Sequence, residues 1–284
     1  MTDRAVPEGH LTTVGEEDGA ELILHWHDEG EGHPVMMLHG SGAGASGWSN
    51  FRHNAAVLAQ RGLRAIMPDM PGYGYSSKPP GRKTYPVSYM AESLMALADA
   101  LGLETFALVG NSMGGAVALT MALDYPDRID RLVLMAPGGL SSREEYMALS
   151  GIKASVAASY SPEGLTREGI RSIFELQLYD TTLITETVLE ERWQIAQLQL
   201  KRMIGRVRVA PLAERLSEVA QPTLAFWGQN DNFCPPSGAQ VLLEQLAGVR
   251  LVQLDRCGHW VMVEHAALFN QMTGDFLTGV YDNG

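Results

Sequence analysis

The chain has 284 residues, of which 45% are hydrophobic and 19% charged, and its formal net charge is -12. This composition supplies enough apolar side chains for a sizeable core and excludes extensive disorder, and the length suits one large alpha/beta domain or one domain with an insertion. The acidic surplus, with no lysine- or arginine-rich run, makes nucleic acid and anionic membranes poor partners.

The first ten residues contain no apolar segment typical of a secretory signal, and no apolar stretch is long enough to cross a bilayer. We therefore expect a soluble, cytoplasmic protein. Cys234 and Cys257 are too few for a disulfide framework and lack metal-ligand spacing, so we expect two reduced structural thiols.

Short apolar runs alternate with helix-like stretches along most of the chain. Loose polar and apolar alternation over residues 11–27 predicts an antiparallel hairpin that turns at 16–19. Continuous apolar runs are typical of parallel strands buried on both faces, and the alternation with helices indicates repeated beta-alpha units. The predicted strands are 35–38, 64–67, 106–109, 132–135, 223–227 and 249–254, and the predicted helices are 54–60, 89–101, 116–123 and 264–277.

The alternation stops at residues 137–139 and resumes near 211. Between them the sequence predicts helices only, with a helix start at Ser161-Pro162-Glu163, an amphipathic stretch over 171–179 and a further helix over 185–200. A helical insertion inside a beta-alpha core is typical of a lid. We therefore predict a core of residues 1–137 and 211–284 and a lid of residues 138–210.

The pentapeptide Gly110-Asn111-Ser112-Met113-Gly114 has the residue pattern of a nucleophile elbow. It follows an apolar run and precedes a helix-favouring stretch, which is the strand, turn and helix context that the motif needs. Glycines two positions from the serine avoid clashes in this tight turn. Because the same pattern also occurs in ordinary strand-to-helix connections, the rest of the chain has to supply the partners of a serine nucleophile.

Those partners are present in the chain order of an alpha/beta hydrolase, Ser112, Asp231 and His259. A serine hydroxyl needs a base, so His259 would accept its proton and Asp231 would hold the imidazole. Asp255 and Glu264 compete for the role of the acid, although the first has too little chain to fold back and the second opens a helix. The alternative interpretation of Asp231 is an ordinary turn residue with no catalytic role.

His39 is the other candidate base, but it follows the strand whose loop should donate N-H groups to an oxyanion. We interpret His39 as structural and predict the Ser41 and Met113 amides as the oxyanion hole. The other histidines considered, His10, His25, His27 and His53, are interpreted as surface or core residues.

Several segments together resemble the meta-cleavage product hydrolases, the carbon-carbon bond hydrolases of bacterial aromatic-ring degradation. The resemblance runs from about His33 to Phe276. The segments that carry it are Gly110 to Ala116, His39 to Gly42 with Gly47 to Asn50, Leu134 to Gly139, Tyr179-Asp180 with Leu183 to Thr185, Glu191-Arg192-Trp193, and Cys257 to Trp260 with Glu264-His265. It implies an alpha/beta-hydrolase fold with a mostly parallel eight-stranded sheet, flanking helices and a helical lid.

By position, the resemblance implies that a set of polar residues contacts the hydroxyl and carboxylate end of a 2-hydroxy-6-oxo-hexa-2,4-dienoate. A guanidinium pairs with a carboxylate bidentately, and amides bind the neighbouring oxygens. These residues are Gly42, Asn50, Asn111, Thr182, Arg192 and Trp260, of which Thr182 is the weaker candidate. From the residues alone, the favoured interpretation is a solvated helix residue for Arg192, a core residue for Trp260 and an N-cap for Asn50.

The chain departs from the family at Ala43, where the glycine loop usually carries a proline. The resemblance implies serine-dependent carbon-carbon hydrolysis that gives 2-hydroxypenta-2,4-dienoate and a carboxylic acid, with neither cofactor nor metal, in a homo-oligomer (a dimer or larger). Phe174, Leu176, Met147 and Leu149 are expected to set the C6 substituent. A carboxylesterase or thioesterase of the same fold, or a ligand receptor that retains the triad, remains an alternative.

Overall fold

The computed structural model describes residues 6–283, so the expectation drawn from the first ten residues falls partly outside it. Within this range, eight strands form one sheet in the order β1-β2-β4-β3-β6-β7-β9-β10. The strands are β1 (His10–Glu17), β2 (Ala20–Glu29), β3 (His33–Leu38), β4 (Leu63–Pro68), β6 (Phe106–Asn111), β7 (Ile129–Met135), β9 (Thr223–Gly228) and β10 (Arg250–Leu254). The predicted hairpin and all six predicted strands are confirmed.

The sheet is parallel from β4 to β10, whereas β1 and β2 pair antiparallel at one edge. Successive residues of a strand point to opposite faces, and the buried strand residues divide accordingly. Leu108 packs on one face with α2 and α3, while Val109 packs on the other with α1 and α10. A central strand buried on both faces needs the continuous apolar run found in this sequence.

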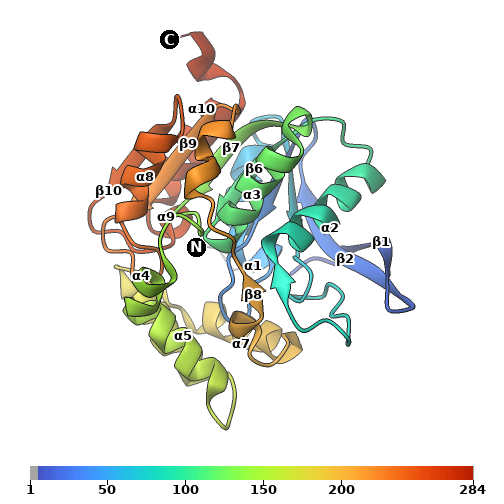
Figure 1. Cartoon of the computed structure of the whole chain (residues 1–284), viewed down its shortest axis with the longest axis vertical. Coiled ribbons are helices and arrows are strands. Elements are labelled where there is room, and N and C mark those ends of the chain that lie inside the picture. Colours follow the sequence, from blue (N-terminus) through green and yellow to red (C-terminus); the bar gives the residue numbers. More distant parts are fainter. Residues whose placement is uncertain (1–5, 284) are drawn as a thin grey trace.

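Helices cover both faces of the sheet (Figure 1). They are α1 (Gly47–Ala59), α2 (Val87–Ala100), α3 (Met113–Asp124), α8 (Ser237–Gln245), α9 (Val261–Glu264) and α10 (Ala266–Leu277). The first begins earlier than predicted because Ser46 and Ser49 form a capping box. Position 50 is therefore inside α1, and the N-cap interpretation of Asn50 is wrong. The predicted final helix is divided at His265, and α8 was not predicted.

Between β7 and β9 lie α4 (Arg143–Ala148), α5 (Ser150–Tyr160), α6 (Arg167–Gln177) and α7 (Glu186–Leu198). Figure 1 shows α5 and α7 together at one end of the molecule. The expectation of helices only is wrong, because β8 (Val207–Arg208) pairs in parallel with β5 (Tyr85–Pro86). That short pairing attaches the end of the inserted segment to the core.

The predicted helix start at Ser161-Pro162-Glu163 is also wrong. Ser161 instead ends α5, and its hydroxyl donates to the carbonyl of Gly164. The next helix begins after Thr166, whose side chain accepts the Gly169 N-H. A serine before a proline therefore marks a turn here, with Gly164 at a positive φ of 77°. Short 3₁₀ helices complete the described elements: Pro126–Arg128, Thr181–Leu183, Met203–Gly205, Ala213–Glu218 and Val280–Asn283.

Over residues 6–283, no helix is both long and apolar enough to cross a membrane. Both cysteines are buried free thiols, as predicted, and burial raises the pKa of each.

Candidate active site

Ser112 lies at the turn between β6 and α3, in a backbone conformation that non-glycine residues rarely adopt. Its φ is 57° and its ψ is -117°. The surrounding backbone holds this strained turn, because Ser112 N-H donates to Met135 O at 2.9 Å and Ser112 O accepts from Gly138 N at 2.9 Å. These are the local features of a nucleophile elbow.

The two elbow glycines leave room for neighbouring backbone. A Cβ on Gly110 would come within 2.5 Å of Gly114 O, and one on Gly114 would come within 2.0 Å of Leu38 O. Both obstacles are backbone atoms, so neither can move without shifting the sheet or the helix.

We expect Gly114→Ala to lower the free energy of unfolding by about 2–3 kcal/mol, because the new methyl group overlaps Leu38 O. Urea denaturation measures this loss. Gly15→Ala is the matched control, since a Cβ there meets nothing within 4 Å, and its effect should stay within about 0.5 kcal/mol. Equal stability of the two variants would contradict the steric explanation.

The structure brings Asp231 and His259 together from the ends of two adjacent strands. His259 Nδ1 lies 2.6 Å from Asp231 Oδ2, and both side chains are buried. The second carboxylate oxygen accepts the N-H groups of Phe233 at 2.7 Å and Cys234 at 2.9 Å. Phe233 also stacks on the imidazole, with ring centroids 5.2 Å apart. The carboxylate can therefore fix both the tautomer and the orientation of His259.

The competing acids occupy other positions. Asp255 is exposed just after β10. Glu264 accepts N-H groups from Gly258 at 2.7 Å, Tyr179 at 2.6 Å and Asp180 at 3.0 Å, so its carboxylate joins the His259 loop to the end of α6. Neither carboxylate is hydrogen-bonded to the imidazole.

His39 is completely buried, and both of its ring nitrogens are used. Nδ1 donates to Gly40 O at 2.8 Å, and Nε2 accepts from Met70 N at 3.0 Å. Burial lowers the pKa of His39 to about 4, so the ring stays neutral at neutral pH. This is consistent with a structural residue that shapes the loop carrying Ser41.

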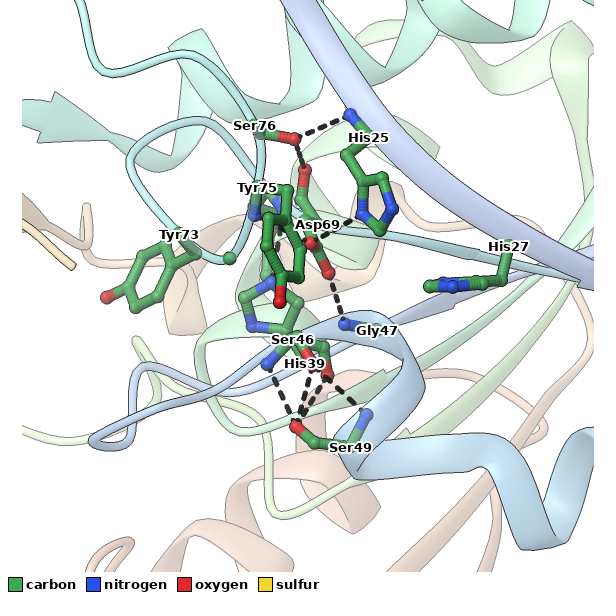
Figure 2. Close-up of polar contacts among 12 residues, drawn as sticks. His25, His27, His39, Ser46, Gly47, Ser49, Asp69, Tyr73, Tyr75 and Ser76 are labelled. Atoms are coloured by element: carbon green, nitrogen blue, oxygen red, sulfur yellow. Dashed lines mark hydrogen bonds and ion pairs between the residues drawn. The ribbon is translucent and has the colours of Figure 1, made fainter. Parts of the chain in front are cut away.

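A second polar network, around Asp69, supports the same loop and the start of α1 (Figure 2). Asp69 Oδ1 accepts from Gly47 N at 2.8 Å, and Oδ2 accepts from His25 Nδ1 at 2.8 Å and from Tyr75 N at 3.0 Å. Burial on its own raises the pKa of Asp69, but the hydrogen bond and charge of His25 outweigh it and lower the pKa. Sequence reasoning missed this carboxylate, because its partners are far apart in the chain.

A pocket opens between the elbow, the His39 loop and the inserted helices. Its polar members include Ser41, Asn50, Asn111, Ser112, Arg192 and His259, and Gly42 and Trp260 also line it. Met113 is the first residue of α3, where the N-H has no partner within the helix. The structure therefore gathers most of the predicted site residues around one cavity.

Arg192 reaches this pocket from α7 and is only 1% exposed. Nη2 donates to Asn50 Oδ1 at 2.7 Å, whereas Nε and Nη1 have no hydrogen-bond partner among the described residues. The adjacent Glu191 is paired with Arg52 at 2.9 Å instead. Burial lowers the pKa of Arg192 to about 9, so the side chain is still a cation at neutral pH. A solvated helix position for Arg192 is thereby ruled out.

Aromatic rings and an amide complete the surroundings of this cation. The Trp260 ring lies 4.7 Å from the guanidinium carbon and packs edge-on against Phe174. Asn111 is fully buried, and its Oδ1 has no hydrogen-bond partner in the described part of the chain. Unpartnered donors and an unpartnered acceptor therefore lie in one buried pocket, which suits a ligand that bears both an anion and a hydroxyl group.

Two expectations about the pocket do not match the structure. Thr182 is exposed, and both its N-H and its hydroxyl donate to Asp180 in a 3₁₀ turn, so it does not line the pocket. The predicted C6 wall is wrong as well, because none of its four residues lines the pocket and Met147 is 41% exposed. The loop at Ala43 is held without a proline, through a hydrogen bond of 2.9 Å from Gly44 N to Gln199 Oε1.

The inserted helices supply a different wall. Ile152, Ser155 and Ser159 of α5 face the pocket, as do Ile173 and Gln177 of α6. Their spacing of three or four residues is that of one helix face, which is the sequence signal that could have identified them.

Comparison with known proteins agrees with this geometry. Residues 33–266 match the family described as the alpha/beta hydrolase fold. The chain is 37% identical to the 2-hydroxy-6-oxo-6-phenylhexa-2,4-dienoate hydrolase of Comamonas testosteroni, over 93% of this chain and 94% of that protein. It belongs to the alpha/beta hydrolases, among the meta-cleavage product hydrolases.

Two further similarities support the assignment of this hydrolase to the meta-cleavage product hydrolases. It is 37% identical to the 2-hydroxy-6-oxononadienedioate/2-hydroxy-6-oxononatrienedioate hydrolase of Comamonas testosteroni, over 94% of this chain and 95% of that protein. The solved meta-cleavage product hydrolase of Pseudomonas fluorescens, complexed with acetates, superposes with a TM-score of 0.82 at 28% identity, over 97% of this chain and 98% of that one. The predicted fold class is confirmed.

Proposed function

We propose that this hydrolase cleaves the carbon-carbon bond between C5 and C6 of a 2-hydroxy-6-oxo-hexa-2,4-dienoate. The observation that carries the proposal is Arg192, a buried cation in the pocket whose Nε and Nη1 have no partner among the described residues. A carboxylate supplies that partner. An ordinary carboxylesterase does not need a cation there, because its substrate is neutral.

In the proposed reaction, Arg192, Asn50, Asn111 and Trp260 bind the carboxylate and the 2-oxygen of the substrate. Stabilisation of charge on the 2-oxygen allows the dienol to ketonise, so that C5 gains a proton. Once C5 is protonated, it can accept the electron pair of the C5–C6 bond when that bond breaks.

Ser112 then attacks the C6 ketone while His259, oriented by Asp231, takes the serine proton. The Ser41 and Met113 N-H groups stabilise the oxyanion. When the C5–C6 bond breaks, its electron pair passes through C5 to the 2-oxygen, and the leaving group takes from His259 the proton that came from Ser112, so that it departs as 2-hydroxypenta-2,4-dienoate and leaves His259 neutral. His259 next activates a water that releases the second product, a carboxylic acid, from Ser112.

The direct test offers the purified protein a set of yellow ring-cleavage dienoates and, in parallel, p-nitrophenyl esters. We expect rapid loss of the dienoate colour, with products identified by mass spectrometry. Fast ester turnover with no bleaching of any dienoate would instead make the protein an esterase, and binding of a dienoate with no turnover of either class would make it a receptor.

Asp231→Asn should lower kcat by about 10³–10⁴-fold, because the amide no longer holds the imidazole in the tautomer that accepts the serine proton. Stopped-flow kinetics on a dienoate measures the effect. Asp255→Asn alters an exposed carboxylate of the same loop region and should change kcat less than about twofold. A large loss in the second variant alone would transfer the role of the acid to Asp255.

We also propose that the enzyme works in the cytoplasm and that it assembles as a homo-oligomer, the second of which the resemblance to its family implies. Sedimentation velocity at several protein concentrations tests the assembly, and a single species with the mass of one chain would contradict it.

A further inference from the structure

The wall of the pocket formed by the inserted helices contains polar side chains that the proposed reaction does not use. Ser155 and Gln177 are only 8% and 5% exposed, and both line the pocket together with the partly buried Ser159. No side-chain hydrogen bond joins any of the three to another residue within 6–283. Their hydroxyl and amide groups are therefore available to a ligand in the cavity, and two of them, those of Ser155 and Gln177, belong to residues that are otherwise buried.

The position of this wall relates it to the reacting end of the substrate. The carbonyl of Gln177 accepts the His259 N-H at 2.8 Å, which places this end of α6 directly against the catalytic loop. Gly151 N donates to Asn232 O at 3.1 Å, so α5 begins against the loop that carries Asp231 and Phe233. The cation that would bind the substrate carboxylate is on α7 instead. A substrate held by Arg192 and attacked at C6 by Ser112 thus presents its C6 substituent to α5 and α6.

Resting on the proposed function, we infer that this hydrolase selects dienoates whose C6 substituent carries a hydrogen-bonding oxygen, such as a carboxyalkyl or hydroxyaryl group. Two hydroxyls and one amide give this wall both donors and acceptors. An unsubstituted phenyl or alkyl group would displace water from them and leave them unpaired, which disfavours its binding.

Apolar residues in the same wall fit the carbon part of such a substituent. Ile152, Ile173 and Phe233 lie among the polar groups. The wall therefore has both apolar and hydrogen-bonding side chains. Its hydrogen-bonding groups distinguish substituents of similar size by whether they carry a polar atom.

The test compares kcat/KM for two matched pairs of dienoates. One pair carries 6-(2-hydroxyphenyl) and 6-phenyl groups, and the other carries 6-(2-carboxyethyl) and 6-propyl groups. We expect the oxygen-bearing member of at least one pair to be preferred by about tenfold or more. A preference within the first pair would show that the wall binds a neutral hydroxyl, and a preference within the second pair would show that it binds a carboxylate.

Variants then assign the preference to the wall. Gln177→Leu and Ser155→Ala should each reduce it severalfold, mainly through kcat/KM of the oxygen-bearing substrate. Gln194→Leu, on the exposed side of α7, is the matched control and should leave the preference unchanged. Circular dichroism and thermal unfolding verify that each variant is folded.

The outcomes separate the inference from the function on which it rests. Cleavage of all four dienoates with no preference, or a preference unchanged in both wall variants, would overturn the inference alone. Failure to cleave any of them would overturn the proposed function and the inference with it.

Discussion

Ser112→Ala should abolish dienoate cleavage, with kcat reduced at least about 10⁴-fold, while the dienoate still binds. The loss follows from the removal of the nucleophile, since His259 and the oxyanion donors cannot replace the covalent step. Binding should persist because Arg192 and the two asparagines are untouched. Single-turnover absorbance spectroscopy measures both quantities, since a bound dienoate that is not cleaved keeps its colour.

The exposed Ser217 offers the control, and Ser217→Ala should match the unmodified enzyme in both measurements. Cleavage by Ser112→Ala at an undiminished rate would remove the serine from the mechanism. A variant that neither binds nor cleaves would show that Ser112 holds the pocket in shape rather than attacking the ketone.

Arg192→Ala should lower kcat/KM for dienoates by about 10²–10³-fold and for p-nitrophenyl esters by less than about tenfold. The difference arises because only the dienoate has a carboxylate for the guanidinium, and a buried charge-assisted pair contributes several kcal/mol. Steady-state kinetics on both substrate classes gives the ratio. Arg192→Lys keeps the charge but not the fork of donors, so its loss should be intermediate.

Arg208→Ala, an exposed arginine in β8, controls for the general effect of removing a positive charge. Equal losses on esters and dienoates in Arg192→Ala would make Arg192 a structural residue, with its hydrogen bond to Asn50 as its main contribution. That result would favour the esterase alternative.

The core of the fold was predictable because each central strand is buried on both faces and therefore appears in the sequence as a continuous apolar run. The candidate triad was predictable for a related reason, since parallel strands bring their carboxyl ends to one edge of the sheet. Asp231 and His259 are 28 residues apart in the chain and only 2.6 Å apart at their side chains. Chain order and strand ends were sufficient to pair them.

The wall of the pocket was less predictable, because it depends on where helices of the insertion begin and which face each one turns inward. The proline after Ser161 suggested a helix start, whereas Gly164 makes a turn there and Thr166 provides the cap. The residues predicted for α6 were Phe174 and Leu176, whereas Ile173 and Gln177 line the pocket. The spacing of three or four residues marks a face of each helix, but long-range packing decides which face is turned to the pocket.

The hydrogen bonds that join α6 to the His259 loop also make this end of the insertion costly to displace. Gln177 O holds the His259 N-H, and Glu264 holds N-H groups on both sides of this junction. If this end of α6 moved away from the core, the His259 N-H would lose its partner Gln177 O, and Glu264 would lose the Tyr179 and Asp180 N-H groups. These three hydrogen bonds therefore hold the α6 end of the insertion, so its displacement would cost more than that of a segment held by packing alone.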